Sequence, residues 1–273
     1  VVRALLEARR RGKQVTAVVE LKARFDEEQN INWAEELERA GVNVVYGFAG
    51  LKIHAKLCLV VRREPKGMRR YAHIGTGNYN ASSAKIYTDL GLFTARDDIC
   101  SDVQDLFNVM TGFGVIDNYR RIFVSPNHLR ANITRLIREE AEIHRAKGGG
   151  RIIMKCNQLV DQGIVRELYE ASRAGVKIEC VVRGICSLRP GIKNVSETIS
   201  VHSIVGELLE HARIYYFEHG GEPVMYVGSA DMMTRNLNGR IEVLTPVLDK
   251  KLMDNILKQI VNPQLADNTH AWE

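Results

Sequence analysis

The chain has 273 residues, of which 45% are hydrophobic and 26% are charged, and its formal net charge is +5. This is an ordinary globular composition, and the length is enough for two domains. No apolar run approaches the ~18 residues of a membrane-spanning helix, and the first residues lack the apolar core of a secretion signal. We therefore expect a soluble protein with no transmembrane segment.

The five cysteines and the charge narrow the class of protein further. An odd number of cysteines without a CxxC pair is typical of reduced thiols, which predicts a cytoplasmic protein. Peripheral attachment to the inner membrane is the alternative location. The basic excess favours an anionic partner but does not identify one. Because the chain begins without methionine, in what reads as the middle of a helix, we expect it to be a piece of a longer protein.

The first elements alternate between helix and strand. LLEARRRGKQVTAVVE, residues 5–20, predicts a helix, a glycine stop and a strand. INWAEELERAGVNVVYGF, residues 31–48, predicts an amphipathic helix that ends at Gly41, followed by a valine-rich strand. This order of elements is typical of an α/β unit.

The next strand, LKIHAKLCLV at residues 51–60, contains a histidine between two lysines. The period of two of a strand puts Lys52, His54 and Lys56 on one face and apolar residues on the other. Burying two ammonium groups beside an imidazole costs free energy unless an anion joins them, and a phosphate fits such a face. A single histidine in a strand is more often a core or edge residue, so this strand alone does not establish a site.

Two further strands complete the first half. YAHIGTGNYN, residues 71–80, predicts a strand that runs into a turn of small residues, whose backbone N–H groups can bind an anion. TDLGLFT, residues 88–94, predicts the closing strand. A helix with a Ser125-Pro126 start and a triple-glycine stop follows, so the domain boundary is expected in the segment just before it.

The second half repeats the first. LYEASRAGVKIECVVR, residues 168–183, has the same helix, glycine and strand as residues 5–20. In LLEHARIYYFEHGG, His211 and Arg213 take the places of His54 and Lys56. MYVGSADMMTRN and RIEVLTP then match the turn strand and the closing strand.

This duplication predicts two related α/β domains, residues 1–122 and 123–273. A histidine and a cation that recur at matching places in two divergent halves are hard to ascribe to packing. We therefore interpret His54 and His211 as functional residues.

The pattern His-x-Lys, followed by a strand and a Gly-Ser/Thr-x-Asn turn, in two copies, resembles the phospholipase D superfamily. The resemblance implies two similar phospholipase D-like α/β domains, each a mixed β-sheet flanked by helices, with the active site between them. The superfamily motif has an aspartate seven residues after the histidine, where this chain has Val61 and Glu218. Phosphodiester hydrolysis of that type is therefore only an alternative.

A second resemblance covers nearly the whole chain. The motifs VELKARFDEEQNI, GLKIHAKLCLVVRRE, HIGTGNYN, YTDLGLFT, LEHARIYYF and GSADMMTRNLNGRIEVLTP together resemble the two C-terminal catalytic domains of bacterial polyphosphate kinases. This family builds polyphosphate from the γ-phosphate of ATP. The resemblance implies a reversible phosphotransferase with ATP, ADP, polyphosphate and Mg²⁺ at its site, a homo-oligomer, and amino-terminal and head domains that this chain lacks. No nucleic-acid partner is expected.

The family's site residues map onto this chain by motif. His54 takes the place of the phosphorylated histidine, and His211 that of the second catalytic histidine. Tyr87 and Arg183 take the places of the nucleotide-site tyrosine and arginine. Arg24 matches a residue of the family's magnesium site, and since a guanidinium has no lone pair for a metal, we expect Arg24 to bind phosphate oxygens that hold Mg²⁺.

Phosphoryl transfer also needs groups that orient the histidines and neutralise charge. We expect Asp89 to orient His54 and Glu242 to orient His211, which would be protonated and donate to the leaving ADP oxygen. The cations expected to offset the charge of the transferred group are Arg24, Lys56, Arg183, Arg213 and Arg240.

This mechanism predicts a geometry. The two histidines should lie within roughly 10 Å of each other on opposite walls of one cleft, because both must reach a single phosphoryl group. The turns at residues 75–78 and 228–231 should border the same cleft.

Three function classes remain open from the sequence. They are the phosphotransferase, a phospholipase D-like phosphodiesterase or nuclease with water as the acceptor, and a fragment that binds anions without catalysis. The formation of ADP and of acid-labile phosphate distinguishes them.

Overall fold

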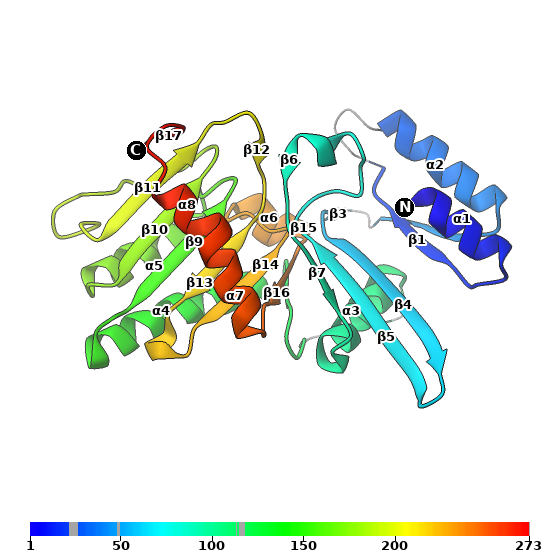
Figure 1. Ribbon diagram of the computed structural model, residues 1–273, viewed down its shortest axis with the longest axis horizontal. Helices are drawn as coiled ribbons and strands as arrows, with labels where there is room; N and C mark the ends of the chain where they lie inside the picture. Colours follow the sequence, from blue (N-terminus) through cyan, green and yellow to red (C-terminus); the bar gives the residue numbers. More distant parts are fainter. Residues whose placement is uncertain (22–26, 48–49, 113, 115–117, 273) are drawn as a thin grey trace.

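The computed structural model describes residues 1–21, 27–47, 50–112, 114 and 118–272. Two units lie side by side, the first carrying the N-terminus and the second the C-terminus (Figure 1). The expected α/β class with two related units is confirmed. No helix in the described ranges is long and apolar enough to cross a membrane.

The first unit consists of short helices and two small sheets. Its elements are α1 (Val2–Arg10), β1 (Thr16–Val19), α2 (Glu27–Arg39), β2 (Asn43–Tyr46), β3 (Lys52–Ile53), β4 (Lys56–Glu64), β5 (Gly67–Gly75), η1 (Ser83–Lys85), β6 (Tyr87–Thr88), β7 (Gly91–Thr94) and α3 (Asp97–Met110). β1 and β2 form a parallel pair, and β4, β5 and β7 form an antiparallel sheet. We expected one mixed sheet here, and the described strands instead form these separate sheets.

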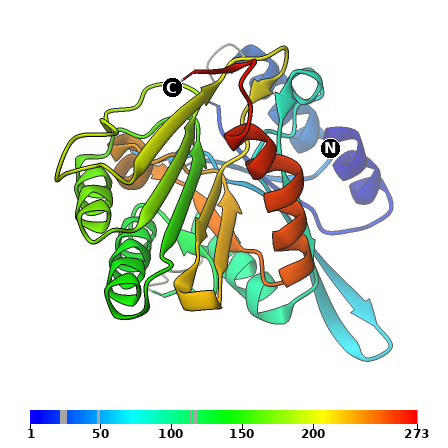
Figure 2. The same cartoon turned by 60° about the vertical axis from the view of Figure 1, so that its left-hand side comes forward.

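The second unit is built on one large sheet. Its elements are β8 (Phe123–Val124), α4 (Leu129–Lys147), β9 (Arg151–Cys156), α5 (Gln162–Arg173), β10 (Lys177–Val182), β11 (Ile199–Ile204), β12 (Leu209–Glu210), β13 (Ile214–Phe217), η2 (His219–Gly221), β14 (Val224–Gly228), α6 (Thr234–Gly239), β15 (Arg240–Ile241), β16 (Val243–Pro246), α7 (Lys250–Ile256), η3 (Leu257–Val261), α8 (Asn262–Leu265) and β17 (Ala271–Trp272). The eight strands follow the order β17-β11-β10-β9-β13-β14-β16-β8. Helices lie on both faces of this sheet (Figure 2).

Local sequence explains the repeated helix-to-strand step. In α5, the side chain of Asp161 caps the helix by accepting from the N–H of Ile164, and Ile164 and Leu168 are fully buried against the sheet. Gly175, with φ +98°, allows the left-handed turn into β10. Gly12, with φ +75°, follows α1 in the same way, so the sequence repeat corresponds to a structural repeat.

The units are joined by two pairs of very short strands. β3 of the first unit pairs in parallel with β15 of the second, and β12 of the second pairs in parallel with β6 of the first. Each pair therefore joins one strand of the first unit to one strand of the second by backbone hydrogen bonds. Both histidines follow directly after one of these strands.

Candidate active site

The strand pairs β3–β15 and β12–β6 fix the backbone of both histidines. The N–H groups of His54 and Ala55 both donate to the carbonyl of Ile241, each at 3.0 Å. The N–H groups of His211 and Ala212 donate to the carbonyl of Thr88 at 3.2 and 3.0 Å. Since Glu242 follows Ile241 and Asp89 follows Thr88 in the sequence, each histidine lies beside a carboxylate of the opposite unit.

His54 is oriented by a buried glutamate. Its Nδ1 lies 2.8 Å from Oε2 of Glu242, whose side chain is fully buried. The hydroxyl of Ser229 donates to the same oxygen at 2.5 Å, and the amide of Asn236 donates to Oε1 at 2.8 Å. His54 keeps 21% of its side chain exposed, and its Nε2 has no hydrogen-bond partner among the residues that the structure describes.

His211 has a matching arrangement. Its Nδ1 lies 2.8 Å from Oδ1 of Asp89, and the hydroxyl of Thr76 donates to that oxygen at 2.6 Å. Gly77 allows this approach, because a Cβ atom there would lie 2.0 Å from Oδ2 of Asp89. In each unit, therefore, a hydroxyl of the small-residue turn holds the carboxylate that orients the other unit's histidine.

The expected pairing of carboxylates and histidines was wrong. We expected Asp89 to orient His54 and Glu242 to orient His211, but the structure pairs His54 with Glu242 and His211 with Asp89. The physical reason is the strand pairing between the units. β3 pairs with β15, which brings His54 beside Glu242, and β12 pairs with β6, which brings His211 beside Asp89.

Burial disfavours the protonated form of both imidazoles. Burial lowers the pKa of His54 below its usual value; Glu242 opposes this, and Lys56 and Arg213 add to it. Burial also lowers the pKa of His211, with Asp89 opposing and Arg213 and Lys56 adding. The two rings therefore share one electrostatic environment. The expected protonated His211 is disfavoured in this state, because burial and two nearby cations outweigh Asp89.

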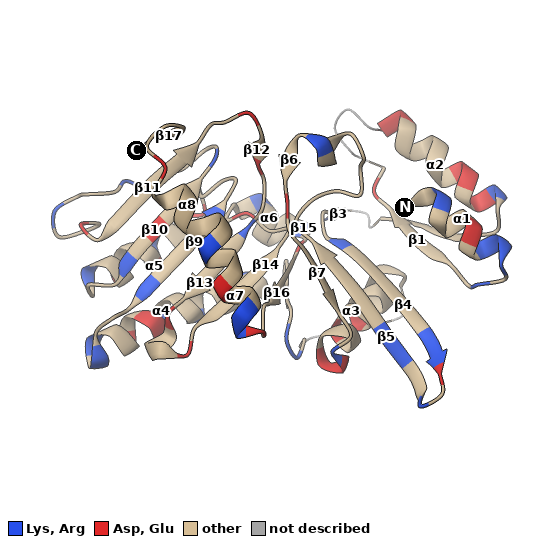
Figure 3. Cartoon of the chain, viewed as in Figure 1, with Lys and Arg blue, Asp and Glu red and all other residues tan. Residues whose placement is uncertain are grey.

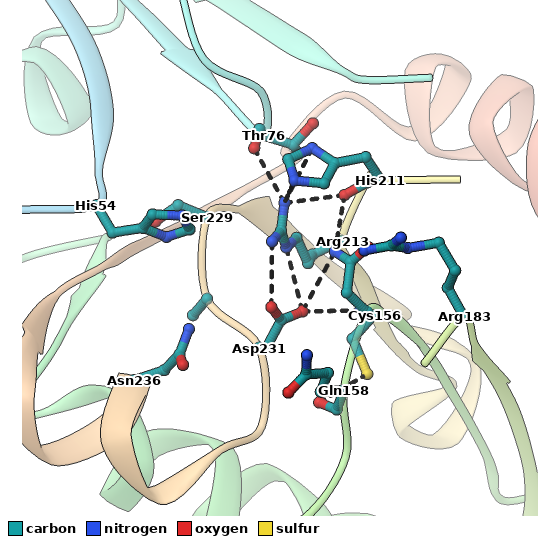
Figure 4. Close-up of polar contacts among 12 residues, drawn as sticks. His54, Thr76, Cys156, Gln158, Arg183, His211, Arg213, Ser229, Asp231 and Asn236 are labelled. Atoms are coloured by element: carbon teal, nitrogen blue, oxygen red, sulfur yellow. Dashed lines mark hydrogen bonds and ion pairs between the residues drawn. The ribbon is translucent and has the colours of Figure 1, made fainter. Parts of the chain in front are cut away.

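Arg213 is buried and paired within the protein. Its Nε and Nη2 donate to the two carboxylate oxygens of Asp231 at 3.2 and 3.1 Å, and its Nη1 donates to the carbonyls of Thr76 and His211 at 3.2 and 2.9 Å (Figure 4). We expected Arg213 to face a bound phosphate. These contacts instead make it a link between the units, because Thr76 belongs to the first and Asp231 to the second.

The same guanidinium packs on the second histidine. Nη1 of Arg213 lies 3.2 Å from Nδ1 and 3.0 Å from Nε2 of His211. A nitrogen nearly equidistant from both ring nitrogens would collide with the ring carbon between them if it lay in the ring plane, so it lies against the ring instead. This contact explains why Arg213 disfavours protonation of His211.

Lys56 is buried without an acidic partner. Its side chain is 6% exposed, and its Nζ donates to the backbone carbonyl of His54. Within the described ranges Lys56 forms no ion pair. Burial lowers its pKa to about 7, with Glu242 opposing and Arg213 contributing.

The remaining predicted residues lie at different parts of the site. Nε of Arg183 donates to the side chain of Asn157 at 2.7 Å, and Asn157 in turn donates to the carbonyl of His211 at 3.2 Å. The centroid of the Tyr87 ring lies 4.9 Å from the centroid of the His211 ring.

Arg240 is half-buried in β15, beside β3 and His54, and burial lowers its pKa. Arg24 lies outside the described residues.

No metal site is evident in the described ranges. They contain no group of three histidine, cysteine, aspartate or glutamate side chains that could hold a metal ion. Asp89 and Glu242 are both engaged with histidines. The described residues thus offer no ready-made set of three such ligands for Mg²⁺.

Two cavities lie away from the histidines. One of about 410 Å³ is lined by the segment that joins the units together with parts of α4, β14 and α7. The other, of about 320 Å³, lies between β7 and α7.

The basic residues are not gathered in one place. Figure 3 shows Lys and Arg in both units, so the positive net charge does not point to one basic surface in that view. The cleft between the histidines stays a prediction.

Sequence reasoning missed the groups that hold the carboxylates. We assigned the small-residue turns to anion binding through backbone N–H groups, whereas the Thr76 and Ser229 hydroxyls bind Asp89 and Glu242. The sequence did contain a signal for these two hydroxyl–carboxylate pairs, because each hydroxyl residue precedes its carboxylate by 13 residues in both units. Asn236 gave no such signal.

The chain is similar to polyphosphate kinases along nearly its whole length. Two family models match it, Polyphosphate kinase C-terminal domain 1 over residues 1–115 and Polyphosphate kinase C-terminal domain 2 over residues 122–273. The polyphosphate kinase 1 of Chlorobaculum tepidum is 53% identical over 273 residues, which are 100% of this chain and 39% of that protein. The polyphosphate kinase of Synechocystis is 54% identical over 274 residues, 100% of this chain and 37% of that protein.

A solved structure is also similar. The crystal structure of polyphosphate kinase from Porphyromonas gingivalis matches with a TM-score of 0.91 and 40% identity, over 99% of this chain and 41% of that chain. The chain thus spans 39% and 37% of the length of the two curated relatives. Because the two family models together match most of its residues, the chain belongs to the polyphosphate kinase family.

Proposed function

We propose that this chain carries the phosphoryl-transfer site of a polyphosphate kinase, with His54 as the residue that receives the γ-phosphate of ATP. The observation that carries the proposal is the state of the His54 ring. Glu242 accepts the Nδ1–H, the pKa is lowered so that the ring is neutral near pH 7, and Nε2 has no partner among the described residues. A neutral imidazole with a free lone pair is a nucleophile.

The first half-reaction forms a phosphohistidine. The Nε2 lone pair of His54 attacks the γ-phosphorus in line, the bond from that phosphorus to the bridging oxygen breaks, and ADP leaves with the bonding electrons. The phosphorylated ring then carries both the Nε2–P bond and the Nδ1–H, and hence a positive charge. Glu242, buried and held by Ser229 and Asn236, stabilises that charge.

The second half-reaction returns the neutral ring. A terminal oxygen of polyphosphate attacks the phosphorus, and the Nε2–P bond breaks. Every step can run backward, so the same residues make ATP from ADP and polyphosphate.

We assign the leaving-group role to His211. Its ring is neutral without substrate, but the negative charge of bound phosphates raises its pKa, and Asp89 accepts the Nδ1–H. Nε2 of the protonated ring then donates to the departing ADP oxygen. Tyr87, beside this ring, and Arg183, joined to it through Asn157, place the nucleotide on this side.

Charge on the transferred group is offset by Lys56, Arg240 and Arg24, the last on the family resemblance alone. We infer that Mg²⁺ enters with the phosphates and is held by their oxygens. The remaining domains of the longer protein complete the site, and the assembly is a cytoplasmic homo-oligomer.

The test is to incubate the full-length enzyme with γ-labelled ATP and to map the label by proteolysis. We expect acid-labile label on His54, lost in His54→Gln and retained, at a lower rate, in His211→Gln. Label on His211, or an unchanged level in His54→Gln, contradicts the proposal. Release of the label only as inorganic phosphate, without polyphosphate growth, indicates water as the acceptor and thus the phosphodiesterase-like alternative.

A further inference from the structure

Two polar residues follow neighbouring strands of the large sheet. β9 ends at Cys156 and β10 ends at Val182. Asn157 and Arg183 are therefore the first residues beyond the carboxyl ends of these two strands. Because β9 and β10 are parallel, both residues lie at the same edge of the sheet, which is the edge where α/β sheets bind ligands.

Asn157 is buried, with 3% of its surface exposed, and its side chain has a defined orientation. Its backbone N–H donates to Oδ1 of Asp231 at 2.8 Å. Its side-chain Nδ2 lies 3.2 Å from the carbonyl oxygen of His211 and 3.4 Å from Oδ1 of Asp231. Both of these groups are acceptors, so only the NH₂ end of the amide can face them. The amide oxygen must point the other way.

That oxygen meets the guanidinium of Arg183. Oδ1 of Asn157 accepts from Nε of Arg183 at 2.7 Å. Nε is the inner nitrogen of the guanidinium, so this bond orients the group and leaves its two outer nitrogens, which have no partner among the residues that the structure describes. Since an amide is uncharged, Arg183 also keeps its full positive charge.

The second buried arginine contact of this site has the opposite character. Arg213 donates from Nε and Nη2 to the carboxylate of Asp231, which neutralises its charge. Arg183 instead has a neutral acceptor on its inner nitrogen and free outer nitrogens. A guanidinium in that state fits a phosphate, which accepts two N–H bonds and supplies the negative charge.

We propose that Asn157 is a positioning residue for the nucleotide: its fixed amide holds Nε of Arg183 and thereby directs the outer guanidinium nitrogens toward the phosphates of ATP or ADP. The inference rests on the proposed function, in which Arg183 binds the nucleotide. The effect is confined to Arg183, because Nη1 of Arg213 also donates to the carbonyl of His211, at 2.9 Å, and continues to hold it when the amide is removed. Loss of the amide should therefore weaken nucleotide binding and leave the binding of polyphosphate unchanged.

The test compares Asn157→Ala, Arg183→Ala and the double variant in the full-length enzyme. Asn157→Ser is a second variant that keeps a polar group in the buried site, but its hydroxyl is one bond shorter than the amide. The matched control is Asn238→Ala, because the side-chain oxygen of Asn238 accepts from Nη2 of Arg130 at 2.9 Å at an exposed position of the same unit. The readouts are the KM for ATP, the KM for polyphosphate and kcat.

We expect Asn157→Ala to raise the KM for ATP about tenfold or more, since a misplaced binding group has effects of this size or larger. The KM for polyphosphate should stay at the wild-type value. In the double variant the KM for ATP should equal that of Arg183→Ala, because Asn157 acts through this arginine alone. Asn157→Ser should resemble Asn157→Ala, and Asn238→Ala should resemble the wild type. A folding defect would instead reduce the amount of active enzyme and leave both KM values unchanged.

Three results overturn the proposal: an unchanged KM for ATP in the Asn157 variants, an equal rise in the KM for ATP and for polyphosphate, or independent effects of the two substitutions in the double variant. Failure of the proposed function gives a different result. If Arg183→Ala leaves the KM for ATP unchanged, the nucleotide-binding role of Arg183 fails. If Arg183→Ala raises that KM and the Asn157 variants do not, only the role of Asn157 fails.

Discussion

Nδ1 of His54, in the first unit, lies 2.8 Å from Oε2 of Glu242, in the second. The proposed nucleophile is therefore oriented by a carboxylate that its own unit does not contain. The same relationship holds in reverse for His211 and Asp89. Because the strand pairs β3–β15 and β12–β6 create both contacts, the site depends on the association of the two units.

The first prediction concerns Glu242→Gln. Ser229 and Asn236 both donate to the glutamate, whereas a glutamine has a single acceptor oxygen and an NH₂ group that favours the wrong His54 tautomer. We expect label transfer to His54 to fall by about 10²–10⁴-fold, the range for groups that control proton position. Rapid-quench measurement with γ-labelled ATP gives the rate.

Asp89→Asn is the matched variant, because it makes the same change at the other histidine. It should slow ADP release and turnover but leave the orientation of His54 intact, so its labelling rate should exceed that of Glu242→Gln. The reverse order would indicate that Asp89 orients the nucleophile.

The second prediction concerns the hydroxyl of Ser229. This buried group donates to Glu242 and accepts from the N–H of Val243 at 3.1 Å, so Ser229→Ala leaves two partners unsatisfied. We expect the free energy of unfolding to fall by about 1–3 kcal/mol, the cost of unsatisfied buried groups. Urea denaturation measures the loss, and a stability equal to wild type would show that water replaces the hydroxyl.

The third prediction is a bell-shaped pH dependence of labelling. His54 must be neutral to attack, and burial lowers its pKa from the usual value of a histidine, so the rate rises with pH on the acidic side of the profile. Lys56 must be protonated to bind phosphate, and its pKa is about 7 in the free protein. Anion binding raises this pKa, so affinity is full below about 7 and falls by at most tenfold per pH unit above it.

Lys56→Met provides the check on this assignment. It should weaken phosphate binding and remove the decline on the basic side, while the rise on the acidic side remains. A basic decline that persists in Lys56→Met would assign that titration to another group.

The fourth prediction concerns the buried pair of Arg213 and Asp231. Asp231→Asn leaves a buried guanidinium without its counterion, so we expect a loss of about 3–5 kcal/mol in the free energy of unfolding. The control is Glu222→Gln, which removes an exposed ion pair with Lys250 and should cost at most ~1 kcal/mol. Equal losses in thermal or chemical unfolding would mean that Arg213 is not held by Asp231.

Much of this fold followed from the sequence because the chain contains the same pattern twice. Helix, glycine and strand recur with local signals such as the Asp161 cap and Gly175, and the histidine and cation recur at the same spacing. These features are encoded within short segments, so a single sequence reveals them. The structure places the predicted residues His54 and His211 each on one of the two predicted carboxylates, Glu242 and Asp89.

The partners of those residues could not be predicted. β3 and β15 each contain two residues, so neither has a pattern that specifies which strand it pairs with. The burial of Arg213 likewise depends on Asp231, 18 residues further along the chain, and on a carbonyl of the opposite unit. Such long-range contacts decided which carboxylate orients which histidine and which cation is left without an acidic partner.

The most direct measurement of the central claim is the isomer of the phosphohistidine. Glu242 occupies Nδ1 of His54 and leaves Nε2 free, so the full-length enzyme, trapped after incubation with ATP, should carry phosphate on Nε2 of His54 alone. Phosphorus NMR of the labelled peptide, together with antibodies specific for each isomer, distinguishes the two nitrogens. Phosphate on Nε2 is the result that this account predicts. Phosphate on Nδ1 would contradict it, because that nitrogen could react only if the contact between His54 and Glu242 were absent.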